Sequence, residues 1–412
     1  MSLDDQERPR VAEVMSGLKD FQQDTVEYAF RRLYLDPEPA SRFLIADEVG
    51  LGKTLVARGL IAKAVDHLWD RVKRIDVLYI CSNLEIARQN IDRLNITSDR
   101  QFQLASRATL LPITLQQLKT NKLNFVSFTP GTSLQLDASR GMAKERWVLY
   151  RLLMKHWRLH EPTCRNVLRG GVQRGNFRKL IYQCDQTETI DKDLARAFYR
   201  ELDANPDLKA EYRRIAGQIG YKRKHVLGEM RAERDAWIGK MRKLLARSSL
   251  SALEPDIVIM DEFQRFKYLL DENDPVALLA RQVFDFKNVK VLLLSATPYK
   301  MYSLAWEPQD DHYQDFYNTS RFLLRGDEAA LAELRQGVSA FRDAYLRAAA
   351  AGATSMDSAK AQIEGILRRI MVRTERLAST ADRNGMLREE PLAQDSLTPH
   401  DFRAFRHFDR IA

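Results

Sequence analysis

Short apolar runs, each about the length of one buried β-strand, recur along the chain and alternate with segments in which apolar residues follow a helical spacing. The runs lie at Phe43–Ala46, Asp76–Cys81, Asn124–Thr129, Asp256–Met260 and Lys290–Leu294. Helical patterns accompany the first two runs, over residues 18–33, 53–68 and 84–94. Buried strands that alternate with helices are typical of a parallel sheet covered by helices. The pattern therefore predicts an α/β fold with a parallel β-sheet.

The alternation stops in a long segment between the third and fourth runs. Residues 135–250 follow a helical pattern and are rich in Arg, Lys and aromatic residues. We interpret this segment as a helical insertion between two strands of the sheet. Aromatic side chains beside basic ones suit contact with nucleic acid, through base stacking and phosphate pairing. They equally suit the core of a helical bundle. The aromatic residues concerned are Trp147, Tyr150, Trp157, Tyr212 and Tyr221.

Charge is distributed unevenly along the chain. The whole sequence has 65 Lys and Arg against 56 Asp and Glu, a formal net charge of +9. Residues 141–250 alone hold 25 basic and 13 acidic residues, a net of +12, so the rest of the chain carries a net of −3. A concentrated basic segment favours a polyanionic partner, above all nucleic acid. The alternative is a solvated helical surface that binds nothing.

Length and composition narrow the class of protein. A chain of 412 residues exceeds one ordinary core, so two or three structural units are expected. No run of about 18 apolar residues occurs, which predicts no membrane span. The polar, charged segment Met1–Arg10 does not resemble a secretory signal. Cys81, Cys164 and Cys184 are scattered without metal-binding spacing, so reduced thiols of a cytoplasmic protein are the simplest interpretation.

The residues after the first apolar run have the features of a phosphate-binding loop. Gly50, Leu51 and Gly52 lead directly into Lys53 and Thr54, which open a helical pattern. Glycines let backbone N–H groups turn toward a phosphate, and the helix N-terminus adds partial positive charge there. In such a loop the lysine reaches the β- and γ-phosphates and the threonine hydroxyl binds Mg²⁺. We therefore predict ATP and Mg²⁺ as cofactors.

Two later strand-like runs end in polar residues. The fourth run, Asp256–Met260, leads into Asp261 and Glu262 and so places both carboxylates at the carboxyl end of its strand. Functional residues of α/β sheets lie at that end. Asp261 suits binding of Mg²⁺, and Glu262 suits polarising an attacking water. The fifth run ends in Ser295 and Thr297, whose hydroxyls we expect to hydrogen-bond the acidic pair and report nucleotide state. The alternative there is a simple turn that ends the strand.

Three of these motifs together resemble motifs I, II and III of superfamily-two helicases, most closely those of the Swi/Snf-like branch. They are DEVGLGKT at residues 47–54, DEFQ at 261–264 and SATP at 295–298. A general phosphate-binding loop has glycine at the first of these positions, where this chain has Asp47. Aspartate there is usual in the Swi/Snf-like branch, so this departure supports the resemblance.

Further segments resemble motifs of the same family. Gln22 resembles the adenine-reading glutamine of the Q motif, because a carboxamide both donates and accepts. Residues 80–83 and the following helix resemble motif Ia, and residues 129–132 a motif that contacts the DNA backbone. Residues 370–376 resemble the segment that joins the family's two lobes. Thr374 stands there in place of the second of two arginines.

The resemblance implies an ATP-binding, RecA-like lobe of a DNA-dependent ATPase. Such a motor couples hydrolysis of Mg-ATP to movement on double-stranded DNA once paired with a second RecA-like lobe. Gln264 lies where the family couples the γ-phosphate to nucleic acid. The implied residues are Lys53, Asp261, Glu262 and Gln264 for catalysis; Gln22, Gly50, Leu51, Gly52, Lys53 and Thr54 for nucleotide; Thr54 and Asp261 for metal; Ser295 and Thr297 for coupling. A non-catalytic ATP-binding scaffold and an RNA helicase fragment remain as alternatives.

The resemblance also predicts how the chain is divided. We expect lobe one in two parts, residues 1–134 and 251–325, with the basic insertion 135–250 between them. A helical extension and linker follow at 326–380, and 381–412 forms a tail or the start of a second lobe. The last 36 residues, after Arg376, spell none of the second lobe's motifs, including its arginine finger. A truncated chain, a split gene and a degenerate member all remain open.

Overall fold

The computed structural model describes most of the chain, with gaps. The described residues are 8–97, 102–104, 107–115, 121–133, 136, 140–221, 228–270, 275–295, 312–347 and 354–374. Two compact units divide the chain, residues 1–374 and 375–412, and every described residue belongs to the first. Thr297 and Arg376, both singled out from the sequence, lie outside the described residues.

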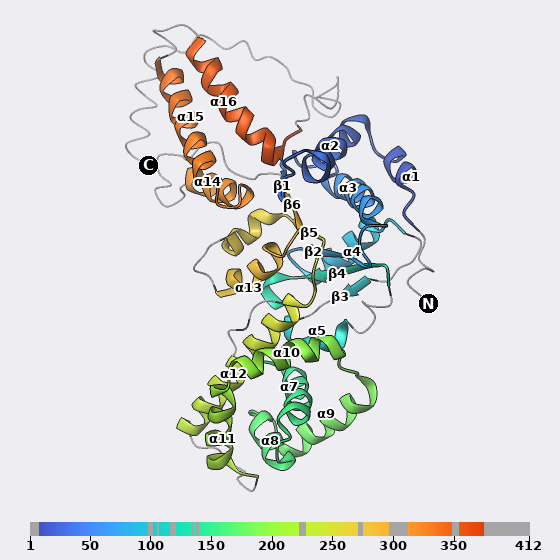
Figure 1. Ribbon diagram of the computed structural model, residues 1–412, viewed down its shortest axis with the longest axis vertical. Helices are drawn as coiled ribbons and strands as arrows, with labels where there is room; N and C mark the ends of the chain where they lie inside the picture. Colours follow the sequence, from blue (N-terminus) through green and yellow to red (C-terminus); the bar gives the residue numbers. More distant parts are fainter. Residues whose placement is uncertain are drawn as a thin grey trace, which may run out of the picture. The chain divides into compact units, whose positions relative to one another are not determined.

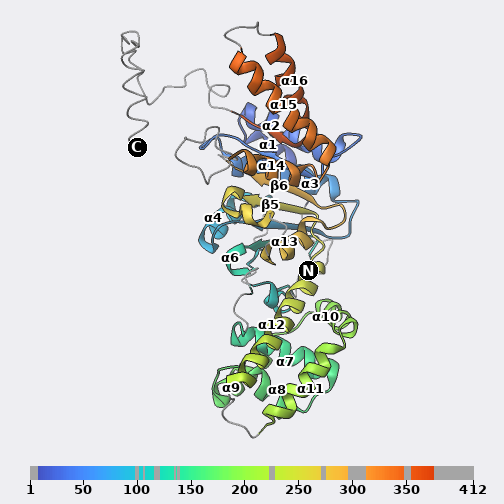
Figure 2. The same ribbon diagram turned by 90° about the vertical axis from the view of Figure 1, so that its left-hand side faces the viewer.

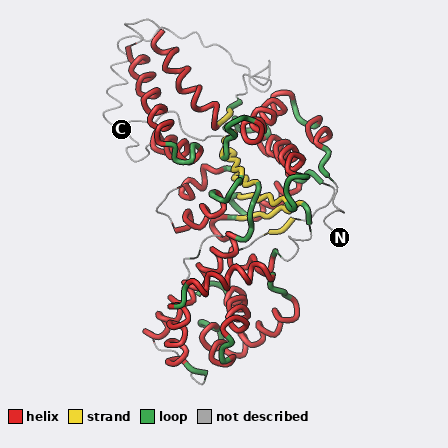
Figure 3. The backbone as a smooth tube through the Cα atoms, viewed as in Figure 1, coloured by secondary structure: helices red, strands yellow, loops and turns green. Residues whose placement is uncertain are grey.

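A seven-stranded β-sheet organises this unit (Figure 3). Its strands run in the spatial order β3-β4-β2-β5-β6-β1-β7, and all six neighbouring pairs are parallel. The strands are β1 (Arg42–Ile45), β2 (Ile75–Ile80), β3 (Phe102–Leu104), β4 (Leu123–Phe128), β5 (Ile257–Asp261), β6 (Lys290–Leu294) and β7 (Met371–Val372). The α/β fold with a parallel sheet is thus confirmed. The sequence analysis predicted the other five strands but not the short strands β3 and β7.

Helices make up most of the remaining described structure (Figure 1). Before the insertion they are α1 (Val11–Ser16), α2 (Asp20–Phe30), the π-helical segment η2 (Arg31–Leu35), α3 (Lys53–Leu68), α4 (Leu84–Leu94), the 3₁₀ turn η3 (Ala108–Leu110), α5 (Leu111–Thr114) and α6 (Pro130–Ser133). The insertion contains α7 (Ala143–Trp157), α8 (Glu161–Leu168), α9 (Arg174–Thr187), α10 (Lys192–Ala204), α11 (Asp207–Ile219) and α12 (Gly228–Ser251). After it come η4 (Phe263–Leu270, 3₁₀), α13 (Pro275–Phe284), α14 (His312–Leu323), α15 (Glu328–Arg347) and α16 (Thr354–Ile370).

Alternate residues of β1, β2, β4, β5, β6 and β7 serve two different cores, one on each face of the sheet. In β5, Ile257 and Ile259 pack with helices α1 to α4. Val258 and Met260 pack instead with α13, α14 and the end of α12. Figure 1 shows α2 and α3 on one side of the strands and α13 on the other. Burial on both faces explains why these strands read as continuous apolar runs rather than alternating ones.

The insertion lies between β4 and β5, as predicted, and its helices α7 to α12 form one bundle (Figures 1 and 2). Helix α12 belongs to two cores. Trp237 and Leu245 pack inside the bundle, whereas Ala246 and Leu250 pack against the sheet. The bundle is therefore continuous with the sheet through α12, a 24-residue helix that leads to β5. Leu194 of α10 also packs in the sheet's core.

Most of the insertion's aromatic residues serve its core. Trp147, Tyr150, Trp157 and Tyr212 are all buried, with at most 8% of each residue exposed. Tyr221, by contrast, is 50% exposed. Of the two interpretations left open, the core of a helical bundle therefore holds for these four rings. The ring of Tyr221 lies edge-on to that of His160, with 5.9 Å between the ring centres.

The three cysteines singled out from the sequence lie inside the fold. Cys81, Cys164 and Cys184 are free and buried. Burial raises the pKa of Cys81 and of Cys164 to about 12, so neither is a thiolate near neutral pH. Among the helices that the structure describes, none combines the length and apolarity needed to cross a membrane.

Candidate nucleotide-binding site

The glycine loop joins the end of β1 to the start of α3. Gly50 and Gly52 have φ angles of 84° and 79°, in the left-handed region that other residues rarely adopt. Gly52 also has no room for a side chain, because a Cβ atom there would lie 2.6 Å from Nε2 of Gln22. Lys53 is the first residue of α3, so the loop delivers its backbone directly to a helix N-terminus. This is the geometry that a phosphate-binding loop requires.

Gln22 is held against this loop, as its assignment to the site required. Its Nε2 donates to the carbonyl oxygen of Leu51 at 2.8 Å, and its Oε1 accepts from the backbone N–H of Lys19 at 3.0 Å. The side chain is 5% exposed. In this structure both ends of the carboxamide bind backbone groups, so Gln22 braces the loop. A carboxamide has two N–H donors and two acceptor lone pairs, and these contacts use one of each, so reading adenine does not require either hydrogen bond to break.

Lys53 lies folded onto its own loop. Its Nζ donates to the carbonyl oxygens of Asp47 at 3.0 Å and Glu48 at 3.1 Å. Burial lowers the pKa of Lys53, while the nearby carboxylates of Asp47, Asp261 and Glu262 oppose that shift. Lys53 is half-buried, and the loop carbonyls bind its ammonium group. The electrostatic contact also places Lys53 near the acidic pair from β5.

Asp261 ends strand β5 and is 8% exposed. Its Oδ2 accepts from the hydroxyl of Tyr79 at 2.6 Å and from Nδ2 of Asn90 at 3.2 Å. Burial, together with the charge of Asp261, raises the pKa of Tyr79, which therefore remains a donor. Two neutral donors thus orient the carboxylate. The sequence analysis missed both; the only signal was a tyrosine within the apolar run of β2.

Glu262 follows in an unusual backbone conformation. Its φ angle is 51°, in the left-handed region that is uncommon for non-glycine residues. Its carboxylate forms an ion pair with Nε of Arg265 at 2.9 Å, and both side chains are substantially exposed. Glu262 directly follows Asp261, the last residue of β5, and its Oε2 atom is buried and accepts no hydrogen bond from the described residues. Arg265 is a further residue that the sequence analysis did not single out.

The third motif meets the second through a direct hydrogen bond. The hydroxyl of Ser295 donates to Oε1 of Gln264 at 2.8 Å. Ser295 is fully buried, and its backbone N–H donates to the carbonyl oxygen of Ile45 at the end of β1. We expected this hydroxyl to bind the acidic pair; the structure places it on Gln264 instead. Ser295 thereby joins the ends of β6, β5 and β1.

The aspartate at the first loop position is completely buried. Asp47 Oδ1 accepts from the backbone N–H of Thr374, just beyond β7. Two backbone hydrogen bonds continue the contact, from Ala46 to Val372 and from Glu48 to Thr374. The segment that resembles a linker between lobes is therefore attached to the glycine loop. Thr374, singled out as a departure from the family pattern, supplies this attachment through its backbone.

The donor set suits a nucleotide with its Mg²⁺ ion. Thr54 follows Lys53 in the first turn of α3, and Asp261 ends β5, which β6 separates from β1 in the sheet. Within the described ranges, no group of three or more His, Cys, Asp or Glu side chains is arranged to hold a metal. A hydroxyl with one carboxylate nevertheless fits Mg²⁺, which usually keeps several waters and binds substrate phosphates.

No protein-family model matches this chain, and no curated protein matches it. The case for its function therefore rests on the residues and their arrangement.

Proposed function

We propose that this chain is the ATP-binding, RecA-like motor lobe of a DNA-dependent ATPase of the Swi/Snf-like branch of superfamily-two helicases. One observation carries the proposal. The glycine loop after β1, Asp261 at the end of β5 and Ser295 after β6 lie at the carboxyl ends of neighbouring parallel strands. Ligand sites of open α/β sheets form at that edge. The three motifs thus converge although they are far apart in sequence.

In the proposed site each residue has a defined task. The backbone N–H groups of Gly50 to Lys53 and the Lys53 ammonium bind the phosphates. Thr54 and Asp261 hold Mg²⁺, which neutralises charge that develops on the phosphoryl group. Glu262 orients the attacking water.

Gln264 would carry the coupling between nucleotide and nucleic acid. Its hydrogen bond to Ser295 supports this role, because that bond ties motif II to the end of β6. A change at the γ-phosphate that moves Glu262 also moves Gln264, two residues along the same turn. The bond to Ser295 would then pass the change to the neighbouring strand.

Nucleotide binding would rearrange two contacts. Lys53 must exchange the carbonyl oxygens of Asp47 and Glu48 for phosphate oxygens. Glu262 must exchange Arg265 for a water molecule. Both existing contacts are exposed or partly buried, so neither exchange requires the core to open.

A basic groove in the insertion supports a nucleic-acid partner. A cavity of about 300 Å³ is lined by four arginines, Arg165, Arg169, Arg174 and Arg178, together with the half-exposed ring of Tyr221. Arginines pair with backbone phosphates, and an exposed ring offers a surface on which a base can stack. Double-stranded DNA is the proposed partner because the motif resemblance is to duplex translocases.

One observation favours the alternative of a non-catalytic ATP-binding scaffold. Lys53 and Glu262, the two charges that catalysis needs most, are both engaged by the chain's own groups. A protein that only binds nucleotide has no need to release Glu262 from Arg265. The cytoplasmic location belongs to both proposals and is supported by three free, buried cysteines.

Measurement of nucleotide binding and turnover separates these functions. Calorimetry with ATP and Mg²⁺ tests binding. Turnover is then compared without nucleic acid, with duplex DNA and with duplex or single-stranded RNA, using the chain alone and with a second RecA-like lobe added. DNA-stimulated turnover supports the motor lobe and RNA-stimulated turnover the RNA helicase fragment. Binding without stimulated turnover in any arm supports the scaffold, and absence of nucleotide binding overturns all three.

A further inference from the structure

Helix α9 of the insertion has a buried face and an exposed face of different composition. It packs against α7, and Figures 1 and 2 show it at the edge of the bundle. Exposed residues of its middle turns include Arg178, Lys179 and Tyr182. The buried face follows a helical spacing and consists of Phe177, Ile181 and Cys184. The exposed face is therefore the one that is available to a partner.

Tyr182 is an aromatic residue that the packing of the bundle does not use. It is 69% exposed. Within the part of the chain that the structure describes, its hydroxyl forms no hydrogen bond and its ring contacts no other ring or cation. A single exposed ring is common on protein surfaces, so the residues around it decide whether it has a role.

The residues beside Tyr182 are basic. Arg178 and Lys179 lie one helical turn before it, at the i−4 and i−3 positions, and are its neighbours on the helix surface. Neither of these two side chains forms an ion pair or a hydrogen bond with the described residues. The surface of α9 thus combines an exposed ring with two positive charges that no carboxylate of the described chain offsets.

The carboxylate of α9 itself is engaged by α7. Asp185, the one acidic residue of α9, accepts a hydrogen bond from Nε1 of Trp147 at 3.0 Å, and Nε of Arg151 lies 3.3 Å from the same oxygen. Its charge is therefore compensated on the side of the helix that faces α7. It does not neutralise the exposed face.

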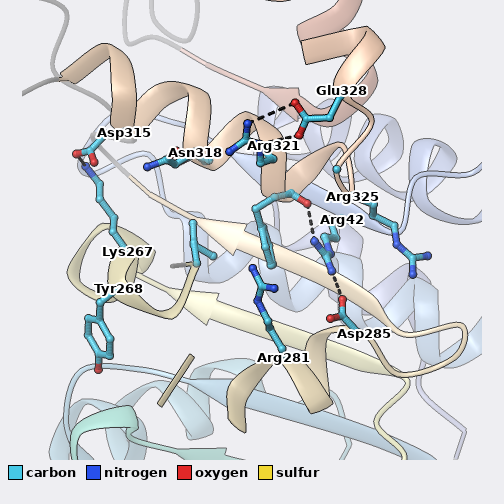
Figure 4. Close-up of a pocket in the computed structure, with 14 residues that line it drawn as sticks. Arg42, Lys267, Tyr268, Arg281, Asp285, Asp315, Asn318, Arg321, Arg325 and Glu328 are labelled. Carbon is cyan, nitrogen blue, oxygen red and sulfur yellow. Dashed lines mark hydrogen bonds and ion pairs between the residues drawn. The ribbon is translucent and has the colours of Figure 1, made fainter. Parts of the chain in front are cut away.

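A cavity of about 620 Å³ at the start of β1 shows the opposite arrangement (Figure 4). There, cations and carboxylates of the same lining form ion pairs with one another. The pairs are Arg42–Asp285, Lys267–Asp315 and Arg321–Glu328. These cations already have anionic partners within the chain, whereas Arg178 and Lys179 are left for an anion from outside it.

Arg178 connects the exposed face of α9 with the basic groove. It lines the groove together with Arg174 and Tyr221. Nη2 of Arg174 donates to the carbonyl oxygen of Tyr221 at 2.7 Å, which holds the residue beside the first turn of α9. Arg174 and Tyr182 are eight residues apart, about 12 Å along the helix axis. A basic stretch therefore runs between two exposed tyrosines.

This combination suits unpaired bases better than an intact duplex. In a duplex the bases already stack on one another, and taking one out of the stack costs free energy. The bases of a single strand stack on exposed aromatic rings, while basic side chains follow the phosphates. We propose that α9 and the adjoining groove bind single-stranded nucleic acid. The inference rests on the proposed function and adds an unpaired strand to the duplex on which the motor acts.

The test measures fluorescence anisotropy of labelled oligo(dT), of an abasic strand of the same length and of a blunt duplex, each with the 412-residue chain. The wild-type chain binds oligo(dT) about tenfold more tightly than the abasic strand, because only oligo(dT) has bases that stack. Tyr182→Leu reduces this ratio about threefold or more, and Tyr182→Trp restores it. Arg178→Gln with Lys179→Gln weakens both strands alike and lowers the slope of log K against log salt by about 1.4.

A matched control introduces the same residue on the same exposed face. Gln186→Leu lies one turn beyond Tyr182 on α9 and leaves the ratio of the two affinities unchanged. Circular dichroism verifies that each variant folds. The proposal is overturned if the wild-type chain binds both strands equally, if Tyr182→Leu keeps the wild-type ratio, or if it weakens the blunt duplex as much as oligo(dT).

The proposed function has a separate readout. Tyr182→Leu leaves Mg-ATP binding at the glycine loop unchanged, because α9 belongs to the insertion and not to the sheet edge that carries the loop. Lys53→Ala leaves oligo(dT) binding unchanged for the same reason. Loss of oligo(dT) binding in Tyr182→Leu with intact Mg-ATP binding supports the inference by itself, and failure of Mg-ATP binding in the wild-type chain counts against the motor lobe alone.

Discussion

Asp47 and Thr374 are 327 residues apart in the chain and are joined by a hydrogen bond of 2.8 Å from the Thr374 backbone N–H to the Asp47 carboxylate. This contact attaches the end of the described unit to the first residue of the glycine loop. The hydroxyls of Thr25 and Thr374 lie 3.3 Å apart, so α2, which carries Gln22, shares the contact. A movement of residues 371–374 would therefore displace both the glycine loop and the helix that carries Gln22.

Mutation can separate two properties of Asp47, its negative charge and its role as the hydrogen-bond acceptor for Thr374. Asp47→Asn keeps an acceptor for Thr374 and removes a buried charge, whereas Asp47→Ala leaves the Thr374 N–H without its partner. We expect Asp47→Ala to lower the free energy of unfolding by about 1–3 kcal/mol, the usual effect of leaving a buried donor unpaired. Chemical denaturation near pH 7 measures this, and an unchanged stability in Asp47→Ala would contradict a structural role for the contact.

The same pair predicts a pH dependence. Burial raises the pKa of Asp47 above its ordinary value of 3.8, so the folded chain holds this proton more tightly than the unfolded chain does. The folded state therefore loses stability from Asp47 as pH rises from about 3.8 through the higher, folded pKa. The Asp47→Asn variant does not lose this stability, because its side chain has no carboxyl group to titrate. Its stability relative to wild type should rise across that pH window and then level off, which thermal unfolding at several pH values tests.

Removal of the loop lysine tests the nucleotide site. Lys53→Ala removes the positive charge that faces the phosphates and should abolish Mg-ATP binding measured by calorimetry. The fold should remain, because Lys53 donates only to the exchangeable loop carbonyls of Asp47 and Glu48. Lys63→Ala, on the same helix but outside the loop, is the matched control and should bind normally. Unchanged affinity in Lys53→Ala would contradict the assignment.

Turnover by the chain alone should be slow. The family's arginine finger belongs to the second lobe, and such a finger contributes roughly three to five orders of magnitude to the rate of related phosphoryl transfers. We expect hydrolysis barely above background with or without DNA, and DNA-stimulated turnover once a second lobe is added. Glu262→Gln should abolish that gain and leave nucleotide binding intact. Robust DNA-stimulated turnover by the monomeric chain would contradict this and direct attention to Arg373 and Arg376, the arginines of the segment that resembles the linker between lobes.

The insertion should supply much of the nucleic-acid affinity. Its complete deletion, the simplest test from sequence, is unsuitable because Ala246 and Leu250 of α12 belong to the core of the sheet. Arg174→Gln with Arg178→Gln instead removes two exposed charges from the basic groove. We expect duplex binding to weaken about tenfold and the slope of log K against log salt to fall by about two, because two phosphate contacts are lost.

A pair of exposed arginines on α10 gives the control for this experiment. Arg196→Gln with Arg200→Gln removes the same charge from the same insertion, outside the groove. Fluorescence anisotropy with a labelled duplex at several salt concentrations compares the two variants. An equal loss of affinity in both would show that the insertion acts through its overall charge, and no loss in either would make its basic face a solvated surface.

The sequence by itself determined where five of the seven strands lie along the chain and which residues form the glycine loop. Apolar runs of strand length predicted β1, β2, β4, β5 and β6, because strands buried on both faces leave no polar interruptions. The loop was predicted from Gly50 and Gly52 followed by Lys53. Its conformation depends on residues that are neighbours in the sequence. The position and helical nature of the insertion were predicted from the same local patterns.

Only the tertiary structure decided which polar groups meet. Asp261 is oriented by Tyr79 and Asn90 from other elements, and Asp47 by Thr374 from the far end of the unit. The periodicity of a helix or strand shows which face is apolar, but not which element packs against it. Buried polar groups must find hydrogen-bond partners wherever packing brings donors and acceptors together. Those partners are set by the assembled fold, and no local segment of this chain specifies them.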